Sequence, residues 1–249
     1  MSYRQGRKGT KGKRKRSFAK TKAARVQNVR TGGFMGRELK FYDQVDTVQL
    51  DATSGNVVSW SPTGDVLNAP VQGSGPSDRD GRQITMKSVH FRGRIRYGTE
   101  GGIGHNPPVA FVRIICVMDK QCNKTALANL NDLLATNAGA VESFLSMREL
   151  ENSQRFRVLY DKTHRLAVSN AAADTGIGPA HYDAKSLVKF DKDLAVPVNY
   201  VANAGASAAD ISDNAIYIFA MQGGETLAST GNTGDFCHLE GHWRLRYTG

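Results

Sequence analysis

The chain has 249 residues, 40% of them hydrophobic, and carries 33 Lys and Arg against 23 Asp and Glu, a formal net charge of +10. This length is usual for one large β-sandwich or barrel and allows a sizeable core. No apolar run reaches transmembrane length and the N-terminus lacks the apolar stretch of a secretory signal, so neither membrane insertion nor secretion is expected.

The positive charge is concentrated in the first thirty residues, which hold twelve cations and no acid. These cations are Arg4, Arg7, Lys8, Lys11, Lys13, Arg14, Lys15, Arg16, Lys20, Lys22, Arg25 and Arg30. Residues 31–249 keep 21 Lys and Arg against 23 Asp and Glu, a charge of about −2. A segment this charged cannot recover its ordering entropy by packing on itself, so we expect a disordered basic arm over residues 1–33.

Three interpretations of the arm compete. A solubilising tail usually mixes signs, whereas twelve like charges repel one another. A nuclear address is compatible with the dense cluster Lys11, Lys13, Arg14, Lys15 and Arg16, which an import receptor would read. Sequence-independent nucleic-acid binding needs many cations on a flexible tether, and the arm fits this best. Glycines 6, 9 and 12 disfavour a membrane-binding amphipathic helix.

The body, residues 34–249, begins with apolar residues that alternate from Leu39 to Leu50 but change phase between residues 45 and 48, which predicts a strand with a bulge. Residues 51–81 are rich in Gly, Pro, Ser and Asp and predict a loop, with a short strand at Val57, Val58 and Trp60.

Residues 82–97 form the clearest two-faced strand. Val89, Phe91 and Ile95 fall on one face together with Gly93 and Tyr97. The other face carries His90, Arg92, Arg94 and Arg96, at a spacing of about 6.6–6.8 Å that suits the phosphates of an extended single strand. The alternative is a solvated face whose arginines pair with acids of a neighbouring strand or subunit.

Residues 109–118 are apolar on both faces except at Arg113, which predicts a central strand covered on both sides. Beyond it, leucines 127, 130, 133 and 134 recur at helical spacing behind Thr125, a residue that can act as N-cap, so we expect a short helix.

Further strands follow in the second half of the chain. Residues 155–160 and 164–168 predict a hairpin around the turn at 161–163, and residues 188–200 predict two strands broken near Pro197. Residues 215–221 predict a second central strand. The last strand turns Leu239, Trp243, Leu245 and Tyr247 inward and His238, Glu240, His242, Arg244 and Arg246 outward.

About eight antiparallel strands with one or two short helical insertions and long loops predict an all-β, two-sheet fold of the jelly-roll or barrel kind. Arg92, Arg94, Arg96, Arg244 and Arg246 are secondary candidates for contacts with nucleic acid or a neighbouring subunit.

Catalytic chemistry has little support. There is no P-loop and no Gly-x-Ser-x-Gly elbow, and the aspartates 119, 161, 191 and 193 are read as turn residues. Cys237, His238 and His242 lack the compact set of ligands that a zinc site needs, so we expect neither a metal nor a cofactor. Cys116, Cys122 and Cys237 are read as reduced and structural.

Four segments in this order resemble the capsid proteins of small circular single-stranded DNA viruses that encode a replication initiator, the group of geminivirus-like and circovirus-like agents. They are Gly32-Gly33-Phe34-Met35-Gly36-Arg37-Glu38-Leu39-Lys40-Phe41-Tyr42-Asp43, the run from Val112 to Asn123, Arg155-Phe156-Arg157-Val158-Leu159-Tyr160-Asp161, and Trp243-Arg244-Leu245-Arg246-Tyr247. Together they span nearly the whole chain.

The resemblance implies a single jelly roll, self-assembly into an icosahedral shell, packaging of single-stranded DNA, nuclear entry and residence in the virion. No Cys or His precedes His90, so the zinc-binding arm of some relatives is not expected. The alternative from another class is a cellular nucleic-acid-binding module with a basic tail and no shell, and RNA would bind the arm in vitro as well as DNA.

Overall fold

The computed structural model describes residues 38–50, 58–59, 66–97, 109–125, 127, 130, 132–135, 145–167, 187–201, 207–224 and 237–249. The chain divides into two units, Met1–Glu38 and Leu39–Gly249, and every strand belongs to the second. The basic arm lies outside the described residues, so its predicted boundary after residue 33 stays a prediction.

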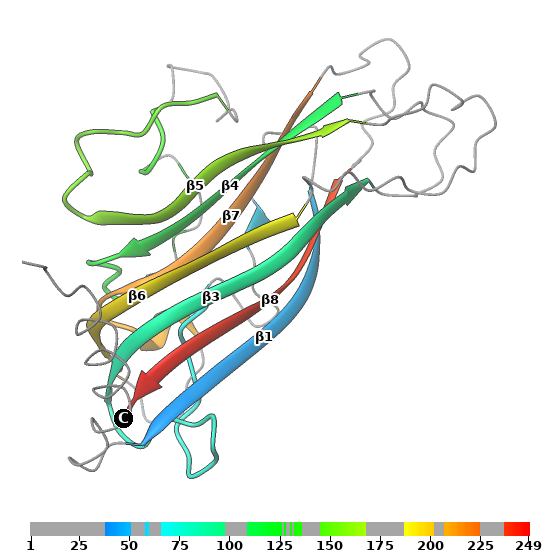
Figure 1. Cartoon of the computed structure of the whole chain (residues 1–249). Helices are drawn as coiled ribbons and strands as arrows, with labels where there is room; N and C mark the ends of the chain where they lie inside the picture. Colours follow the sequence, from blue (N-terminus) through cyan, green and yellow to red (C-terminus); the bar gives the residue numbers. More distant parts are fainter. Residues whose placement is uncertain are drawn as a thin grey trace, which may run out of the picture. The chain divides into compact units, whose positions relative to one another are not determined.

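Within the described residues, eight strands form two four-stranded sheets (Figure 1). The strands are β1 (Leu39–Leu50), β2 (Val58–Ser59), β3 (Gln83–Tyr97), β4 (Val109–Asp119), β5 (Phe156–Ala167), β6 (Leu187–Asn199), β7 (Ala215–Gly224) and β8 (Cys237–Thr248). The first sheet has the order β1-β8-β3-β6 and the second β2-β7-β4-β5. All pairings between these strands are antiparallel.

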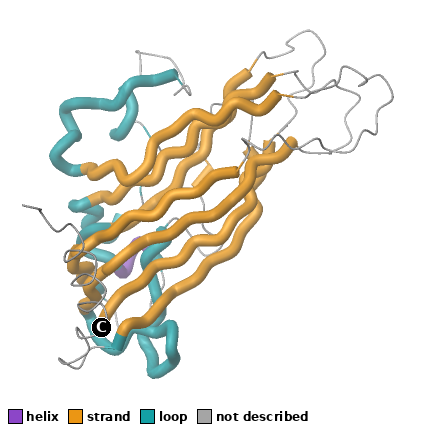
Figure 2. The backbone as a smooth tube through the Cα atoms, in the orientation of Figure 1, coloured by secondary structure: helices purple, strands orange, loops and turns teal. Residues whose placement is uncertain are grey.

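The path of the chain between the sheets defines a jelly roll. Only β4 and β5 are consecutive neighbours within one sheet, and every other connection crosses to the opposite sheet. Figure 2 shows these strands as two layers joined by loops. This is the double-sheet arrangement of eight strands that the name denotes. The predicted all-β fold is confirmed.

One hydrophobic core joins the two sheets. Trp243 of β8 is fully buried, and its indole N–H donates to the carbonyl of Leu67 at 3.0 Å. Phe190 of β6 meets Trp243 edge-on and stacks on Tyr160 of β5, with ring centroids 6.2 and 4.6 Å apart. Aromatic pairs at these distances add to the stabilisation from burial alone. Most residues of β3 and β8 that the alternating pattern placed on the inner face are therefore part of this core.

The two predicted central strands are also confirmed. β4 and β7 occupy the middle of the second sheet and pair along their length. Every residue from Val112 to Asp119 is buried, as expected for a strand covered on both faces.

The bulge predicted in the first strand is wrong. β1 pairs with β8 in unbroken register from Leu39 to Leu50. The phase slip arises because the first half of β1 turns its apolar residues outward, with Leu39 and Phe41 50% exposed. On the inner side Lys40 is buried and its ammonium reaches Asp80 Oδ1 at 2.6 Å and the carbonyl of Asp78 at 3.0 Å.

Two predicted breaks are absent because polar or cyclic residues sit inside continuous strands. β5 runs through residues 161–163, so the predicted hairpin is wrong; Asp161 is paired with Ile115 of β4. β6 runs through Pro197, which lies opposite Thr85 on the edge of the first sheet. An edge strand tolerates a residue without an N–H on its open side.

The helix predicted after Thr125 is also wrong for the residues that are described. Leu130 accepts hydrogen bonds from the amides of Leu133 and Leu134, both at 2.8 Å, which closes a single turn. The chain then extends, because the amide of Ala135 donates to the carbonyl of Met147 and that of Glu149 to Leu133. The four leucines are buried. The helical element described is the 3-10 turn Ala208–Asp210.

Candidate nucleic-acid interface

The twelve arm cations, including the predicted nuclear-targeting cluster at residues 11–16, lie outside the described residues. The secondary candidates do lie within them. Arg92, Arg94 and Arg96 are on β3, and Arg244 and Arg246 are on β8, its neighbour in the first sheet. The structure therefore brings all five onto one face of one sheet.

We call this outer face of the first sheet the arginine face. Directly opposed residues of paired strands share a face, so the register groups its side chains into rows across β1, β8, β3 and β6. Four successive rows are Thr47–Glu240–Arg94–Leu187, Val45–His242–Arg92–Lys189, Asp43–Arg244–His90–Asp191 and Phe41–Arg246–Ser88–Asp193.

Glu240 pairs with two arginines of β3, which leaves the group of three with one net positive charge. Its carboxylate accepts from Arg94 Nε at 2.5 Å and from Arg96 Nε. Burial would raise the pKa of this carboxyl, but the hydrogen bonds and charges of Arg94 and Arg96 outweigh burial and leave the pKa below its usual range. Both guanidinium groups are thereby held in fixed orientations.

Arg244 forms a two-pronged pair with Asp43 across the β8–β1 boundary. Nε and Nη2 donate to the two carboxylate oxygens at 2.7 and 2.6 Å, which raises the pKa of the guanidinium through the hydrogen bonds. Its Cζ also lies 5.6 Å from the ring centroid of Phe41. The pair is exposed on both sides, so its net stabilisation is small.

His90 and Asp191 pair across the β3–β6 boundary. His90 Nδ1 lies 2.8 Å from Asp191 Oδ1, and Nε2 lies 2.9 Å from Ser88 Oγ. A carboxylate only accepts, so Nδ1 carries the proton in this contact. The hydrogen bond from His90 is the main cause that lowers the pKa of Asp191.

Two of the five arginines form no ion pair within the described part of the chain, although the charge of Arg92 contributes to lowering the pKa of Asp191. The ion pairs there include neither Arg92 nor Arg246. The row of Arg92 contains no acid, although Lys189 in it lies 3.8 Å from Asp191 of the next row. His238, predicted to point outward, is on this face but buried.

A second group of polar contacts lies on β4 and β5, and sequence reasoning missed it. Arg113 and Asp161 form a two-pronged pair at 2.8 and 2.9 Å, with side chains only 10% and 12% exposed. Asp161 also accepts from Arg148, at 3.0 Å. Burial would raise the pKa of Asp161, but these two arginines outweigh burial and lower it. Arg113 further donates to the carbonyl of Ser146 at 2.5 Å.

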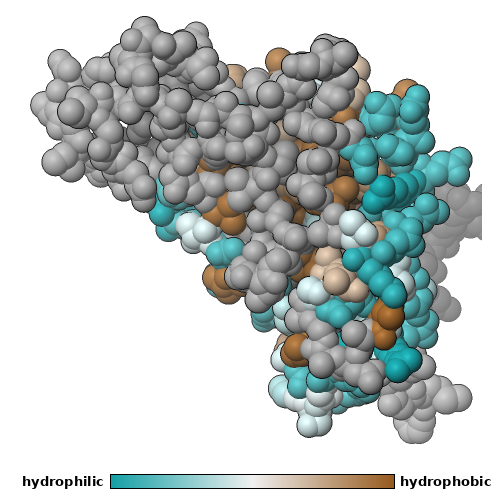
Figure 3. All heavy atoms as spheres, turned by 180° about the vertical axis from the view of Figure 1, so that it is seen from behind, coloured by the Kyte–Doolittle hydropathy of each residue, from teal (hydrophilic) through white to brown (hydrophobic). Residues whose placement is uncertain are grey.

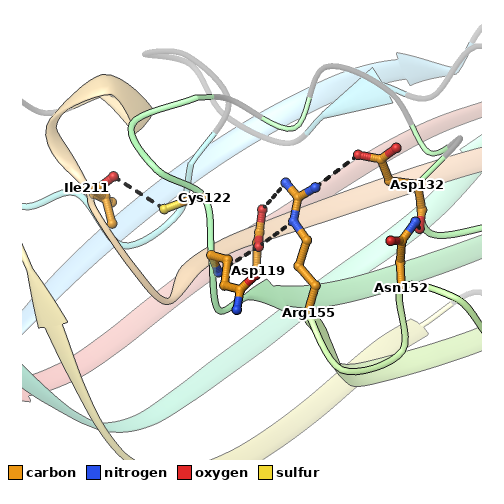
Figure 4. A network of polar contacts seen from close by, with 7 residues as sticks. Asp119, Cys122, Asp132, Asn152, Arg155 and Ile211 are labelled. Carbon is orange, nitrogen blue, oxygen red and sulfur yellow. Dashed lines mark hydrogen bonds and ion pairs between the residues drawn. The ribbon is translucent and has the colours of Figure 1, made fainter.

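Arg155 makes a similar link at the end of β4 (Figure 4). It donates to both oxygens of the fully buried Asp119, at 3.0 and 2.7 Å, and to Asp132 at 3.1 Å. Its hydrogen bonds with Asp119 raise the pKa of the guanidinium.

The prediction that four aspartates lie in turns is correct for one of them. Asp119 accepts a hydrogen bond from the amide of Gln121 in the turn after β4. Asp161, Asp191 and Asp193 lie inside strands, so for these three the prediction is wrong.

The described residues offer neither a set of metal ligands nor a disulfide. No group of three His, Cys, Asp or Glu among them could hold an ion. All three cysteines are buried and outside any disulfide. Burial raises the pKa of Cys237 to about 12 and that of Cys116 further, so both thiols stay protonated and unreactive. Within the same residues no helix has the length and hydropathy to cross a membrane.

The described body is thus an eight-stranded jelly roll with a charged outer sheet face, and it follows an acid-free basic segment. This fold is typical of viral capsid domains and of lectins, and the basic segment favours a viral coat protein. The chain belongs to the geminivirus coat protein/nuclear export factor BR1 family, whose model matches residues 2–231. The resemblance seen in the sequence is confirmed, and the chain has the structural role of a virion component.

Other comparisons add little. Among the solved structures, VP1 of Trichodysplasia spinulosa-associated polyomavirus in complex with GM1 oligosaccharide is 10% identical over 84% of this chain and 93% of that chain. The TM-score is 0.22, too low to carry an argument. No curated protein matches the chain.

Proposed function

We propose that copies of this coat protein assemble into a closed icosahedral shell that packages circular single-stranded DNA, with the basic arm neutralising the phosphates. The observation that carries the proposal is the partition of charge. Twelve cations without one acid precede a body that carries about −2. A jelly roll supplies the rigid wall, and the arm supplies the counterions that a packaged polyanion requires.

Exposed apolar side chains support contacts between copies. Leu145, Met147 and Leu150 are 74%, 81% and 79% exposed within one short segment. Figure 3, the view from behind, shows hydrophobic residues at the described surface beside hydrophilic ones. Grouped apolar side chains on a surface commonly mark a protein–protein interface.

The backbone that carries these side chains is anchored rather than free. Leu134 and Arg148 form an isolated bridge, and Arg113 holds the carbonyl of Ser146. Such an apolar segment loses little further conformational entropy when a partner covers it, which favours assembly.

The cluster Lys11, Lys13, Arg14, Lys15 and Arg16 serves in addition as the address for a host import receptor, a role that agrees with the nuclear export factor in the family's description. The same charges suit both partners, because neither a receptor's acidic groove nor a phosphate chain needs a folded arm.

Negative-stain electron microscopy of the purified full chain with circular single-stranded DNA tests the proposal. We expect closed particles of uniform size that protect the DNA from nuclease. Met147→Lys places a charge in the apolar segment and should abolish particles while leaving a folded, soluble chain. A monomer or small oligomer that binds DNA without forming particles would instead support the cellular packaging module.

A further inference from the structure

Some arginines of the arginine face form ion pairs with carboxylates, and others do not. Glu240 holds Arg94 and Arg96, and Asp43 holds Arg244. Arg92 and Arg246 have no such partner among the described residues. Both have exposed side chains, and His242, the neighbour of Arg92 in its row, is exposed as well.

Arg92, His242 and Arg246 follow the direction of the strands. His242 and Arg246 flank Arg244 on β8, and Arg92 lies beside His242 on β3. Side chains on one strand face recur every ~6.6–6.8 Å, close to the distance between successive phosphates of an extended polynucleotide. A single strand laid along the second half of β8 would therefore meet His242, Arg244 and Arg246 in succession.

An exposed aromatic ring completes the surface. Phe41 of β1 lies directly opposite Arg246 and is 50% exposed. Arg244 approaches its ring to 5.6 Å and keeps it beside the cations. Aromatic rings next to cations on a sheet are the elements with which proteins bind single strands without sequence preference, through stacking and phosphate contact.

We propose that Phe41, Arg92, His242 and Arg246 form a second binding strip for single-stranded DNA, on the body of the coat protein. Arg92 and Arg246 contact phosphates, and Phe41 stacks on a base. The carboxylates Asp43 and Glu240 orient the arginines around the strip. The inference rests on the proposed function, since it assigns part of the packaged DNA to the sheet in addition to the arm.

The charge of the strip favours single-stranded DNA over a second copy of the chain as its ligand. The exposed Leu39 and Val45 of β1 would also suit a protein partner. However, the body carries about −2 overall, while the row Val45–His242–Arg92–Lys189 contains two cations, Arg92 and Lys189, and no acid. A polyanion matches that row better than another largely neutral surface does.

The phosphate contacts are tested with the full chain carrying Arg92→Gln and Arg246→Gln. The matched control is Arg157→Gln with Arg165→Gln, two exposed arginines of β5 on the other sheet. Affinity for oligothymidylate is measured by fluorescence anisotropy over a series of salt concentrations. The strip variant should lower the slope of log affinity against log salt by about 1.4, and the control should leave it unchanged.

The stacking contact is tested with Phe41→Leu and, as the conservative variant, Phe41→Tyr. Loss of one stacked base should weaken binding of oligothymidylate roughly tenfold and leave binding of an abasic strand of equal length unchanged. Tyrosine should restore the affinity.

Some outcomes would contradict DNA binding by the strip and leave DNA binding by the arm intact. If the strip variant and the β5 control show equal slopes while neutralising Lys13, Arg14, Lys15 and Arg16 lowers the slope, the arm alone binds DNA. If the strip variant loses particles at an unchanged slope, the surface is an interface between copies. If neither the arm nor the strip variant changes the slope, the proposed function fails as well.

Discussion

The two sheets carry the same arginine–carboxylate chemistry in two different settings. On β4 and β5, the pair Arg113–Asp161 is almost buried, with side chains 10% and 12% exposed. On the first sheet, Arg244 and Asp43 are 49% and 46% exposed at similar donor–acceptor distances. Distance alone therefore does not show what an ion pair contributes.

Solvent decides the difference. An exposed pair in water gains roughly 0–1 kcal/mol because solvent and salt screen its charges. A buried pair is costly to desolvate, and removal of one partner strands the other charge, which costs about 3–5 kcal/mol. The pairs of the second sheet thus fix the body, whereas the exposed pairs leave their cations free to exchange a carboxylate for a phosphate at little cost in stability.

The largest expected effect comes from breaking the buried pair. Asp161→Asn leaves Arg113 buried without a counter-charge and also releases Arg148, so the free energy of unfolding should fall by about 3–5 kcal/mol. Chemical denaturation followed by tryptophan fluorescence measures this. A loss below about 1 kcal/mol would show that the pair behaves like a surface pair.

Acidification should act on the same pair with a smaller effect. The pKa of Asp161 is depressed in the folded state, so its contribution to stability is complete above its unfolded pKa of about 3.9 and is lost as the pH falls through the folded pKa. Between pH 5 and pH 2 the unfolding midpoint of the parent chain should therefore fall more steeply than that of Asp161→Asn. Parallel profiles would contradict the assignment.

Breaking the ion pairs of Glu240 with Arg94 and Arg96 should affect DNA binding more than folding. Glu240→Gln should lower the free energy of unfolding by about 1 kcal/mol or less. It also removes the negative charge that Arg94 and Arg96 share, so oligothymidylate should bind more tightly and with a steeper salt dependence. Weaker binding in this variant would mean that Glu240 is needed to place the arginines.

The smallest effect is expected for Asp43→Asn, which removes the carboxylate from a pair exposed on both sides. Its free energy of unfolding, measured by chemical denaturation, should change by no more than roughly 0.5 kcal/mol, as is usual for surface substitutions. A loss comparable to that of Asp161→Asn would abolish the contrast between the two sheets.

Much of the fold could be predicted from residue patterns. Alternation located β3 and β8, and apolar runs located the central strands β4 and β7, because burial on one or both faces leaves a direct trace in the sequence. Asp161 and Pro197 misled for a common reason. Both residue types favour turns, but the ion pair of Asp161 with the buried Arg113 and the edge position of Pro197 override that tendency.

The candidate interface was less predictable. The order of cations along β3 and β8 can be read from the sequence, but their register cannot. Only the register shows that Glu240 lies opposite Arg94, next to the row of Arg96, while Arg92 has no acid in its row. One signal was available for the other network. Arg113 interrupts an otherwise apolar strand, and a buried cation requires a nearby acid, yet strand pairing was needed to identify Asp161 as that acid.

The salt dependence of DNA binding tests the central claim most directly. The full chain should bind oligothymidylate with log affinity falling against log salt at a slope of about −5.6, as expected for about six phosphate contacts from the arm and two from the strip. Replacement of the twelve arm cations by glutamine should bring the slope close to the contribution of the strip alone. An unchanged slope in that variant would contradict the account.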